Sequence, residues 1–526
     1  MSSSNTHIIN KVFVEIDTKS KERAYQIKDN INSFINDTLF PRLSEYFDSI
    51  SLNPDDQFIQ IDSLNIEVDL GAKESLKELE PVILKKVQEK IFKLDTHTSS
   101  VDKDSGFSIK SSKDKTFDSW VYFLDNGTDV WWESSNSAPH LLENSFLIDL
   151  NSRDRKSRLY RILHKKTSLL RLINQFEDEA ITKVFEILFS DFRKEENNWN
   201  LFSIEKLNLE ASRYSGADRK NFWTIIFSKI INYNDQQEIV DLFIQILNNK
   251  LKIRNQDLGR VWEFVGRKTI DTAIPELLLE IDQLVLEFQN DFKSTTESEK
   301  TPSKDFENPD TENVIKKQSE ENSEVDKNTL SSDAKEQSSK VKEVERILKK
   351  IEGLDDELQT ESTDEVYINN AGLILTHPFL NQLFSTCQLI NEEGEIIDKE
   401  KAVHLLHYVV TGREMQTENL MVFEKFICNI PIQYPINRFV KLPEEFKKNA
   451  DEMLEALLNH WAVLKSSSID LLRNEFLQRS GKLIFSDSRP RIIIERKTQD
   501  ILLDKIPWNI SMIKLPWQDK LIFMDW

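Results

Sequence analysis

The chain has 526 residues, and at roughly 100–200 residues per domain this length predicts two to four folded units. Its 69 basic and 90 acidic residues give a net charge of −21 and an isoelectric point near 5.0, which disfavours nucleic acid and anionic membranes as partners. Two cysteines are too few for a disulfide framework, and the sequence shows neither a signal-peptide pattern nor an apolar run of about 18 residues. We therefore expect a protein made in the cytoplasm without stable membrane insertion.

The N-terminal segment, residues 1–95, has the pattern of a small α+β module. Apolar and polar residues alternate at 12–16 and again at 57–71, which predicts two half-buried strands. Between them, apolar residues recur at helical spacing from 24 to 50, and Pro41 stands where a second helix would begin. We therefore expect a β-α-β module.

Residues 96–150 are rich in serine, lysine and aspartate and poor in aliphatic side chains, so a flexible connector is expected. An aromatic cluster interrupts this segment, and its members are Trp120, Tyr122, Phe123, Trp131 and Trp132. The cluster is either a docking patch or a local core. The local core is favoured because large aromatic rings gain most from burial.

Residues 151–292 change to a helical period, in short amphipathic segments separated by turns. This pattern predicts a helical array of antiparallel hairpins or a solenoid-like stack. No repeat of fixed length is present, so the pattern indicates an architecture without naming a repeat family or a function.

Residues 293–340 are almost all charged or small and polar, which predicts a disordered acidic linker because little apolar surface is available to offset the entropy of ordering. Residues 341–526 open with an amphipathic helix and continue with helical patterns at 399–412 and 467–481. Short apolar runs broken by turns follow, and they predict a small antiparallel sheet at the end. The fold class expected for the whole chain is α+β and mostly helical.

Motifs for catalysis are missing, since the chain has no GxxxxGK[ST], GxSxG, HExxH or paired CxxC. His404 and His407 are spaced i, i+3 on a predicted helix and could bind a metal with Cys387 or Cys428, so a metal-dependent hydrolase stays open as an alternative. The apolar residues of that helix share the opposite face, which places both histidines toward solvent or a partner. We therefore expect no cofactor, no metal and no enzymatic activity.

Three tryptophans near the end of the chain, Trp508, Trp517 and Trp526, recur about nine residues apart, next to turns or the chain end. Tryptophan is enriched in interaction hot spots, so these residues join His404 and His407 as candidates for partner binding. Packing within the domain core is the competing interpretation and is favoured.

An ordered series of segments between residues 368 and 526 is more informative about function than the apolar periodicity of the individual elements. The series is NAGLILTHPFL, KAVHLLHYVVTG, ENLMVFEKFICNIPIQYPI, ALLNHWAVLKSSSIDLLRNEFLQRSGKL, IIIERKTQDILLDKIPWNISMIKLPW and LIFMDW. In its order, its spacing and its PW-containing ending, it resembles the tape-measure family of contractile injection systems. The opening HIINKVFVEI and the strand QIDSLNIEVDLG resemble the N-terminal region of the same family.

That family belongs to bacterial phage-tail-like particles, in which a contractile sheath surrounds an inner tube built on a baseplate. The resemblance implies a non-enzymatic assembly protein that sets or controls inner-tube length, with inner-tube and baseplate proteins as partners. A ruler must be extended, and 526 residues in one helix would reach roughly 790 Å, far more than compact domains span. A folded assembly chaperone or scaffold is therefore the alternative, and copy number and incorporation into the assembled particle stay open.

Overall fold

The computed structural model describes residues 7–9, 12, 14–16, 18, 20–50, 57–61, 63–69, 75–96, 107–130, 132, 152–192, 204–231, 236–252, 257–269, 274–298, 365–485 and 489–526. The chain divides into unit 1, made of Met1–Asn197 and Gly412–Leu442, and unit 2, made of Asn198–Thr411 and Pro443–Trp526. Both units are thus discontinuous in sequence. The segment boundaries expected from the sequence stay a prediction.

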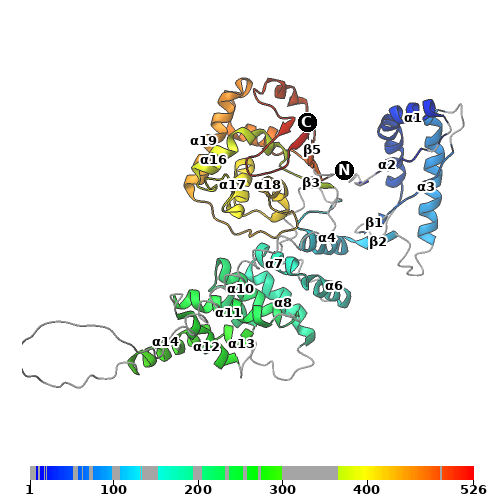
Figure 1. Cartoon of the computed structure of the whole chain (residues 1–526). Coiled ribbons are helices and arrows are strands. Elements are labelled where there is room, and N and C mark those ends of the chain that lie inside the picture. Colours follow the sequence, from blue (N-terminus) through cyan, green and yellow to red (C-terminus); the bar gives the residue numbers. More distant parts are fainter. Residues whose placement is uncertain are drawn as a thin grey trace, which may run out of the picture. The chain divides into compact units, whose positions relative to one another are not determined.

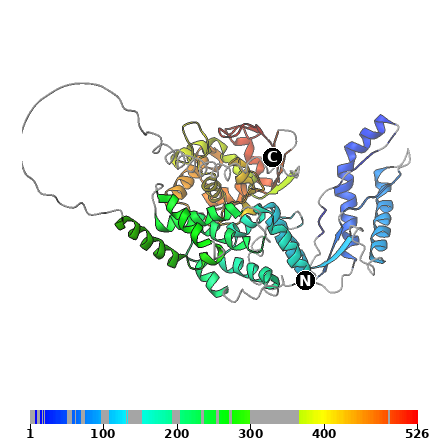
Figure 2. The ribbon, with the colours of Figure 1, turned by 60° about the horizontal axis from the view of Figure 1, so that its bottom comes forward.

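Two helical stretches pack against each other in the N-terminal part of unit 1 (Figures 1 and 2). One runs from α1 (Lys21–Ser33) through a π-helical turn (Phe34–Leu39) into α2 (Phe40–Asp48). The π turn precedes Pro41, which lacks an N–H and crowds a carbonyl one turn earlier, so the helix widens there. The other stretch is α3 (Leu79–Thr96). Their shared core consists of Phe34, Leu39, Leu43, Leu79, Val87 and Ile91.

An antiparallel ribbon pairs β1 (Gln57–Ile61) with β2 (Phe107–Ser111), and Ile59 lies opposite Ile109. The strand expected at 57–71 is thus present in its first five residues. The strand expected at 12–16 is not found, because residues 12 and 14–16, the described part of that stretch, have no regular secondary structure. The strand that pairs with β1 comes instead from the segment expected to be a flexible connector.

The described helices that follow in this part of unit 1 are α4 (Ser112–Asn126), α6 (Arg153–Leu163), α7 (Lys166–Gln175) and α8 (Asp178–Phe192). Helix α4 packs on α6 and α7, and α6 also contacts α8. The hydroxyls of Ser111 and Ser152 cap the first turns of α4 and α6 by accepting from backbone N–H groups. Residues 107–126 therefore have regular structure where the sequence indicated a connector.

The aromatic cluster lies mainly inside unit 1. Trp120 and Phe123 are fully buried, and Phe176 meets the edge of the Trp120 ring with centroids 6.0 Å apart. Tyr122 and Trp132 are half-buried, and Trp131 lies outside the described residues. The local-core interpretation is confirmed for Trp120 and Phe123.

The rest of unit 1 comes from Gly412–Leu442, which carries a 3₁₀ turn, η8 (Glu418–Met421), and the short helix α18 (Val422–Ile427). Sequence interpretation placed this stretch within one C-terminal segment, 341–526. The structure groups it with helices that precede it by more than two hundred residues, for reasons given by the buried charges described below.

The array expected at 151–292 is divided between the units, with α6, α7 and α8 in unit 1. The first part of unit 2 holds its later helices, α9 (Ile204–Ala211), α10 (Gly216–Ser228), α11 (Gln236–Leu251), α12 (Leu258–Thr269), α13 (Ile274–Leu278) and α14 (Ile281–Ser298). Helix α10 packs along α11, which also contacts α12, α13 and α14. Phe222, Trp223 and Phe227 of α10 are fully buried. Helix α14 includes residues 293–298 of the expected linker, and the rest of that linker lies outside the described residues.

The second part of unit 2 begins and ends with strands. Its helical elements are η7 (Ala371–Thr376), α16 (His377–Thr386), α17 (Lys399–Thr411), α19 (Glu444–His460), η9 (Ala462–Leu464), α20 (Ile469–Leu472), a π-helical turn (Arg473–Leu477) and η11 (Thr498–Lys505). The predicted helix at 399–412 is confirmed as α17. The predicted helix at 467–481 is shorter and widens into the π turn.

A five-stranded sheet in the order β3-β4-β5-β7-β6 completes unit 2. Its strands are β3 (Glu365–Ile368), β4 (Gly481–Ile484), β5 (Arg491–Ile494), β6 (Met512–Ile513) and β7 (Ile522–Asp525). The pairs are antiparallel except β5 with β7, which is parallel, so the expected small antiparallel sheet is in fact mixed. The mostly helical α+β class is confirmed.

Gly372 allows two backbone segments of unit 2 to approach closely. A Cβ atom at this position would lie 2.8 Å from the Cα and carbonyl oxygen of Leu477. Backbone atoms cannot move aside as a flexible side chain can, so only glycine fits. This contact packs η7 against the π turn that precedes β4.

We predict that Gly372→Ala lowers the free energy of unfolding by about 3 kcal/mol because of this overlap. The matched control is Gly266→Ala on the exposed face of α12, where an added Cβ meets nothing within 4 Å. It should raise the free energy of unfolding by roughly 0.5–1 kcal/mol through helix propensity. Urea unfolding followed by circular dichroism measures both, and equal effects would contradict the close approach.

Candidate functional site

Three charged side chains form a cluster in the interior of unit 1. Arg171 comes from α7, Glu418 from η8 and Lys425 from α18, and all three side chains are at most 1% exposed. Glu418 Oε1 accepts from Arg171 Nε at 3.3 Å and from Lys425 Nζ at 2.7 Å. We call these three residues the buried ion cluster.

Backbone carbonyls take the remaining donors of the buried ion cluster. The two terminal nitrogens of Arg171 donate to the carbonyls of Leu124 and Gln433, each at 2.5 Å. Lys425 Nζ donates to the carbonyls of Ile432 at 2.5 Å and Tyr434 at 2.6 Å. A buried charge is tolerated only when it is paired and hydrogen-bonded, and this arrangement meets both conditions.

Further bonds join the same two stretches of chain. Gln175 donates to the carbonyl of Ile436 at 2.8 Å, and its own side-chain oxygen accepts from the Glu418 N–H at 2.9 Å. The Arg438 N–H donates to the carbonyl of Asn174 at 3.0 Å. The buried ion cluster and these bonds hold Gly412–Leu442 against the end of α7. The arrangement fixes the position of the backbone in both stretches. Each of the three clustered side chains is engaged in it, so none is left to act as an acid or a base.

Gly127 ends α4 beside the buried ion cluster, in the left-handed conformation with φ +75°. A Cβ atom there would lie 2.9 Å from Arg171 Nε, so a side chain would displace the guanidinium. The end of α4 therefore approaches the buried ion cluster too closely for any residue with a side chain at position 127.

Helix α6 is basic in an acidic chain, with five lysines and arginines between residues 153 and 163. Two of these point to α4, where Arg155 pairs with Asp114 at 2.6 Å and Arg158 pairs with Asp118 at 2.8 Å. The hydrogen bond from Arg155 is the main cause that lowers the pKa of Asp114, and burial of the carboxylate acts in the opposite direction.

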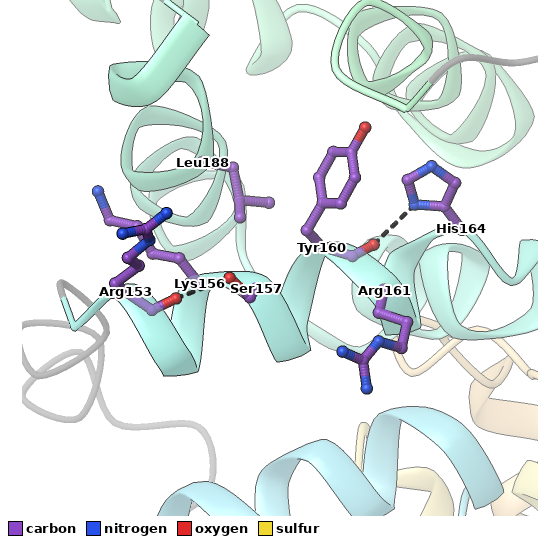
Figure 3. Close-up of a pocket in the computed structure, with 7 residues that line it drawn as sticks. All are labelled: Arg153, Lys156, Ser157, Tyr160, Arg161, His164 and Leu188. Atoms are coloured by element: carbon purple, nitrogen blue, oxygen red, sulfur yellow. Dashed lines mark hydrogen bonds between the residues drawn. The ribbon is translucent and has the colours of Figure 1, made fainter.

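The opposite side of α6 borders an open groove of about 810 Å³ (Figure 3). We call it the α6 groove, and the described residues that line it are Arg153, Lys156, Ser157, Tyr160, Arg161, His164 and Leu188. Tyr160 and His164 make edge-on ring contact at 4.4 Å between centroids, and His164 Nδ1 donates to the Tyr160 carbonyl at 2.8 Å. Figure 3 shows Tyr160 on the same side of the helix as Leu188, while Arg161 points to the opposite side of the helix.

The candidate tryptophans are half-buried, and each contacts other residues of unit 2. Trp508 donates to the carbonyl of Leu375 at 3.1 Å, and Trp526 donates to Asp500 at 3.0 Å. Trp517 packs on Phe384 with ring centroids 4.9 Å apart. These contacts agree with packing inside the domain, and a role in partner binding stays a prediction.

The candidate histidines lie elsewhere than expected. His404 and His407 are each only 3% exposed, so the expectation that they face solvent is wrong. The helical-wheel argument assumed one buried face, whereas α17 is buried on nearly all sides from Ala402 to Val410. His407 Nδ1 lies 3.4 Å from the Asn370 amide nitrogen. Among the described residues, no group of three or more His, Cys, Asp or Glu side chains is arranged to hold a metal.

Sequence reasoning missed both the buried ion cluster and the α6 groove. Glu418 and Lys425 are ordinary charges in isolation, although Lys425 stands in the apolar run MVFEKFI, where a charge needs a buried partner. The basic run RDRKSRLYRILHKK was a visible signal for the groove, because it contrasts with the net charge of the chain. Neither pattern identifies a partner residue without the fold.

The comparison with protein families gives the class of the protein. The chain matches the family described as contractile injection system tape measure protein over residues 6–526, and it belongs to that family. No curated protein and no solved structure matches the chain. In the part of the chain that the structure describes, helices long and apolar enough to cross a membrane are absent.

We predict that Glu418→Gln lowers the free energy of unfolding by about 3–5 kcal/mol, because it leaves Arg171 and Lys425 buried without their shared anion. The matched control is Glu179→Gln, which removes an exposed pair with Lys183 on α8 and should cost about 0.5 kcal/mol or less. Urea unfolding followed by tryptophan fluorescence compares the two. Equal costs would show that the buried ion cluster does not hold unit 1 together.

A second prediction concerns pH and His377, at the start of α16. Burial lowers the pKa of this imidazole below its ordinary 6.5, while the hydrogen bond to the Ile374 carbonyl acts the other way. The unfolded chain therefore binds a proton first as pH falls below about 6.5, so the folded state loses stability there. His377→Gln should make the decline in melting temperature between pH 7 and pH 5 shallower, and parallel curves would contradict it.

Proposed function

We propose that this chain sets or controls the length of the inner tube while a contractile injection system assembles, and that it does so without catalysing a reaction. The observation that carries this proposal is the family match, which covers residues 6–526 and hence nearly the whole chain. The buried ion cluster supports a structural role, since its charged groups bond to one another and to backbone carbonyls.

The fold bears on how length control would work. The longest single helices in the described residues, α3 and α14, have 18 residues and therefore span about 27 Å each. A protein built from such elements does not act as one long helical rod. Length control would then depend on segments outside the described residues, or on several copies of the chain.

A folded assembly chaperone or scaffold for the tube or baseplate is the second candidate. The observation that favours it is the discontinuous unit 1, in which two distant stretches are joined by buried charges. Under either candidate we propose that inner-tube and baseplate proteins are the partners and that the chain is made in the cytoplasm. Incorporation of the chain into the particle is independent of that choice.

Changing the length of the segment between α14 and β3 tests the two candidates. Deleting residues 305–328 leaves every described helix and strand in place, and duplicating them adds the same 24 residues. We expect shorter tubes with the deletion and longer tubes with the duplication, by at most roughly 80 Å per extended copy. Tube lengths are measured by electron microscopy of purified particles.

The matched control scrambles residues 305–328 without changing their number, and it should leave tube length unchanged. Normal lengths in both the deletion and the duplication would contradict length control by this segment. Normal lengths with fewer particles would favour the scaffold instead.

A further inference from the structure

The five-stranded sheet of unit 2 has one buried face and one exposed face. Side chains alternate between the two faces along each strand, so the pairing register decides which residues share a face. The buried face is at most 3% exposed at Leu483, Ile492, Ile494, Ile513 and Ile522. We call the opposite face the outer sheet face.

Two rows of paired residues make up the outer sheet face. The first row crosses four strands and consists of Tyr367, Lys482, Ile493 and Asp525. The second row crosses all five strands and consists of Glu365, Ile484, Arg491, Phe523 and Met512. Large apolar side chains are open to water here, since Tyr367 is 54% exposed, Met512 48% and Ile493 39%.

The charged residues of the outer sheet face neutralise one another in pairs. Lys482 pairs with Glu365, and its ammonium group lies 5.4 Å from the centre of the Tyr367 ring. Arg491 pairs with Asp525. These four charges sum to zero, so the face is suited to an apolar occupant and not to a charged ligand.

The outer sheet face is too small for a stable contact with a second molecule. Five strands of up to four residues cover about 19 by 13 Å, or about 250 Å². A stable interface buries about 800 Å² on each partner. A segment of the same chain needs far less area, because a short connection holds it at an effective concentration in the millimolar range.

Residues 341–351 are a segment of this kind, and they lie outside the described residues. Their sequence is VKEVERILKKI, in which the apolar residues recur at helical spacing and share one side of a helix. A helix of this length is about 16 Å long, close to the width of the outer sheet face. Residues 352–364 connect the segment to β3, an edge strand of the sheet, and 13 residues reach at most about 45 Å.

We propose that residues 341–351 form a helix whose apolar side packs on the outer sheet face of the same chain. The contact removes from water the apolar side of that helix together with Tyr367, Ile493 and Met512, and this burial drives it. The packing does not depend on the proposed function. If that function holds, the packed helix makes residue 341 the end of the segment after α14 whose length matters.

Hydrogen exchange of the purified full-length chain, read by mass spectrometry, tests the packing. The amides of residues 341–351 should exchange about tenfold more slowly than those of an unstructured chain. The variant Ile347→Gln/Leu348→Gln, on the apolar side of the segment, should remove that protection. The matched control is Lys342→Gln/Glu345→Gln on the polar side, which also leaves the net charge unchanged and should keep the protection.

The variant Ile493→Thr tests the sheet side of the contact. It shortens an apolar side chain on the outer sheet face, and it should raise exchange in residues 341–351 by about threefold or more. Amides of β4 should stay protected, which separates lost packing from lost folding. The matched control is Ile397→Thr, the same substitution at a position that is 64% exposed and outside the sheet strands, and it should leave exchange unchanged.

Three results would overturn the proposal. Protection that falls on about fiftyfold dilution would assign the contact to a second copy of the chain. Exchange of residues 341–351 at the rate of an unstructured chain would show that the segment does not pack. Protection that is unaffected by Ile493→Thr would place the helix on another surface.

Failure here is distinguishable from failure of the proposed function. Hydrogen exchange is measured on the isolated chain, whereas tube length is measured on particles. Particles of altered length in the segment-deletion strain, together with unprotected residues 341–351, would reject the packing and retain length control.

Discussion

Glu418 meets Arg171 across 247 positions of sequence, and this buried contact joins the two separate stretches of chain that make up unit 1. Closing a loop of this length costs about 5 kcal/mol in chain entropy, beyond a constant for the closure itself. The bonds of Arg171, Lys425 and Gln175 to backbone must together exceed that cost. Until residues 412–442 are synthesised, α7 would present an unpaired buried cation, so unit 1 cannot complete its fold early in translation.

The same constraint limits how the protein can be extended. Residues 172–417 are fixed at both ends by the buried ion cluster, so they cannot be drawn into a line while the cluster is intact. A force that stretches the chain through unit 1 must first separate Glu418 from its two cations. A force applied at the two ends of that loop therefore extends residues 172–417 only after the cluster has separated.

The sequence predicted elements whose signal is local. Helix α17 was expected within one residue of its observed bounds, because its apolar period needs no partner to be visible. Helix α4 was missed because Asp114 and Asp118 made its sequence look like a solvated connector, whereas both carboxylates pair with α6. The burial of His404 and His407 and the parallel pairing of β5 with β7 depend on distant segments, and no local pattern carries that information. The buried ion cluster belongs to the same class.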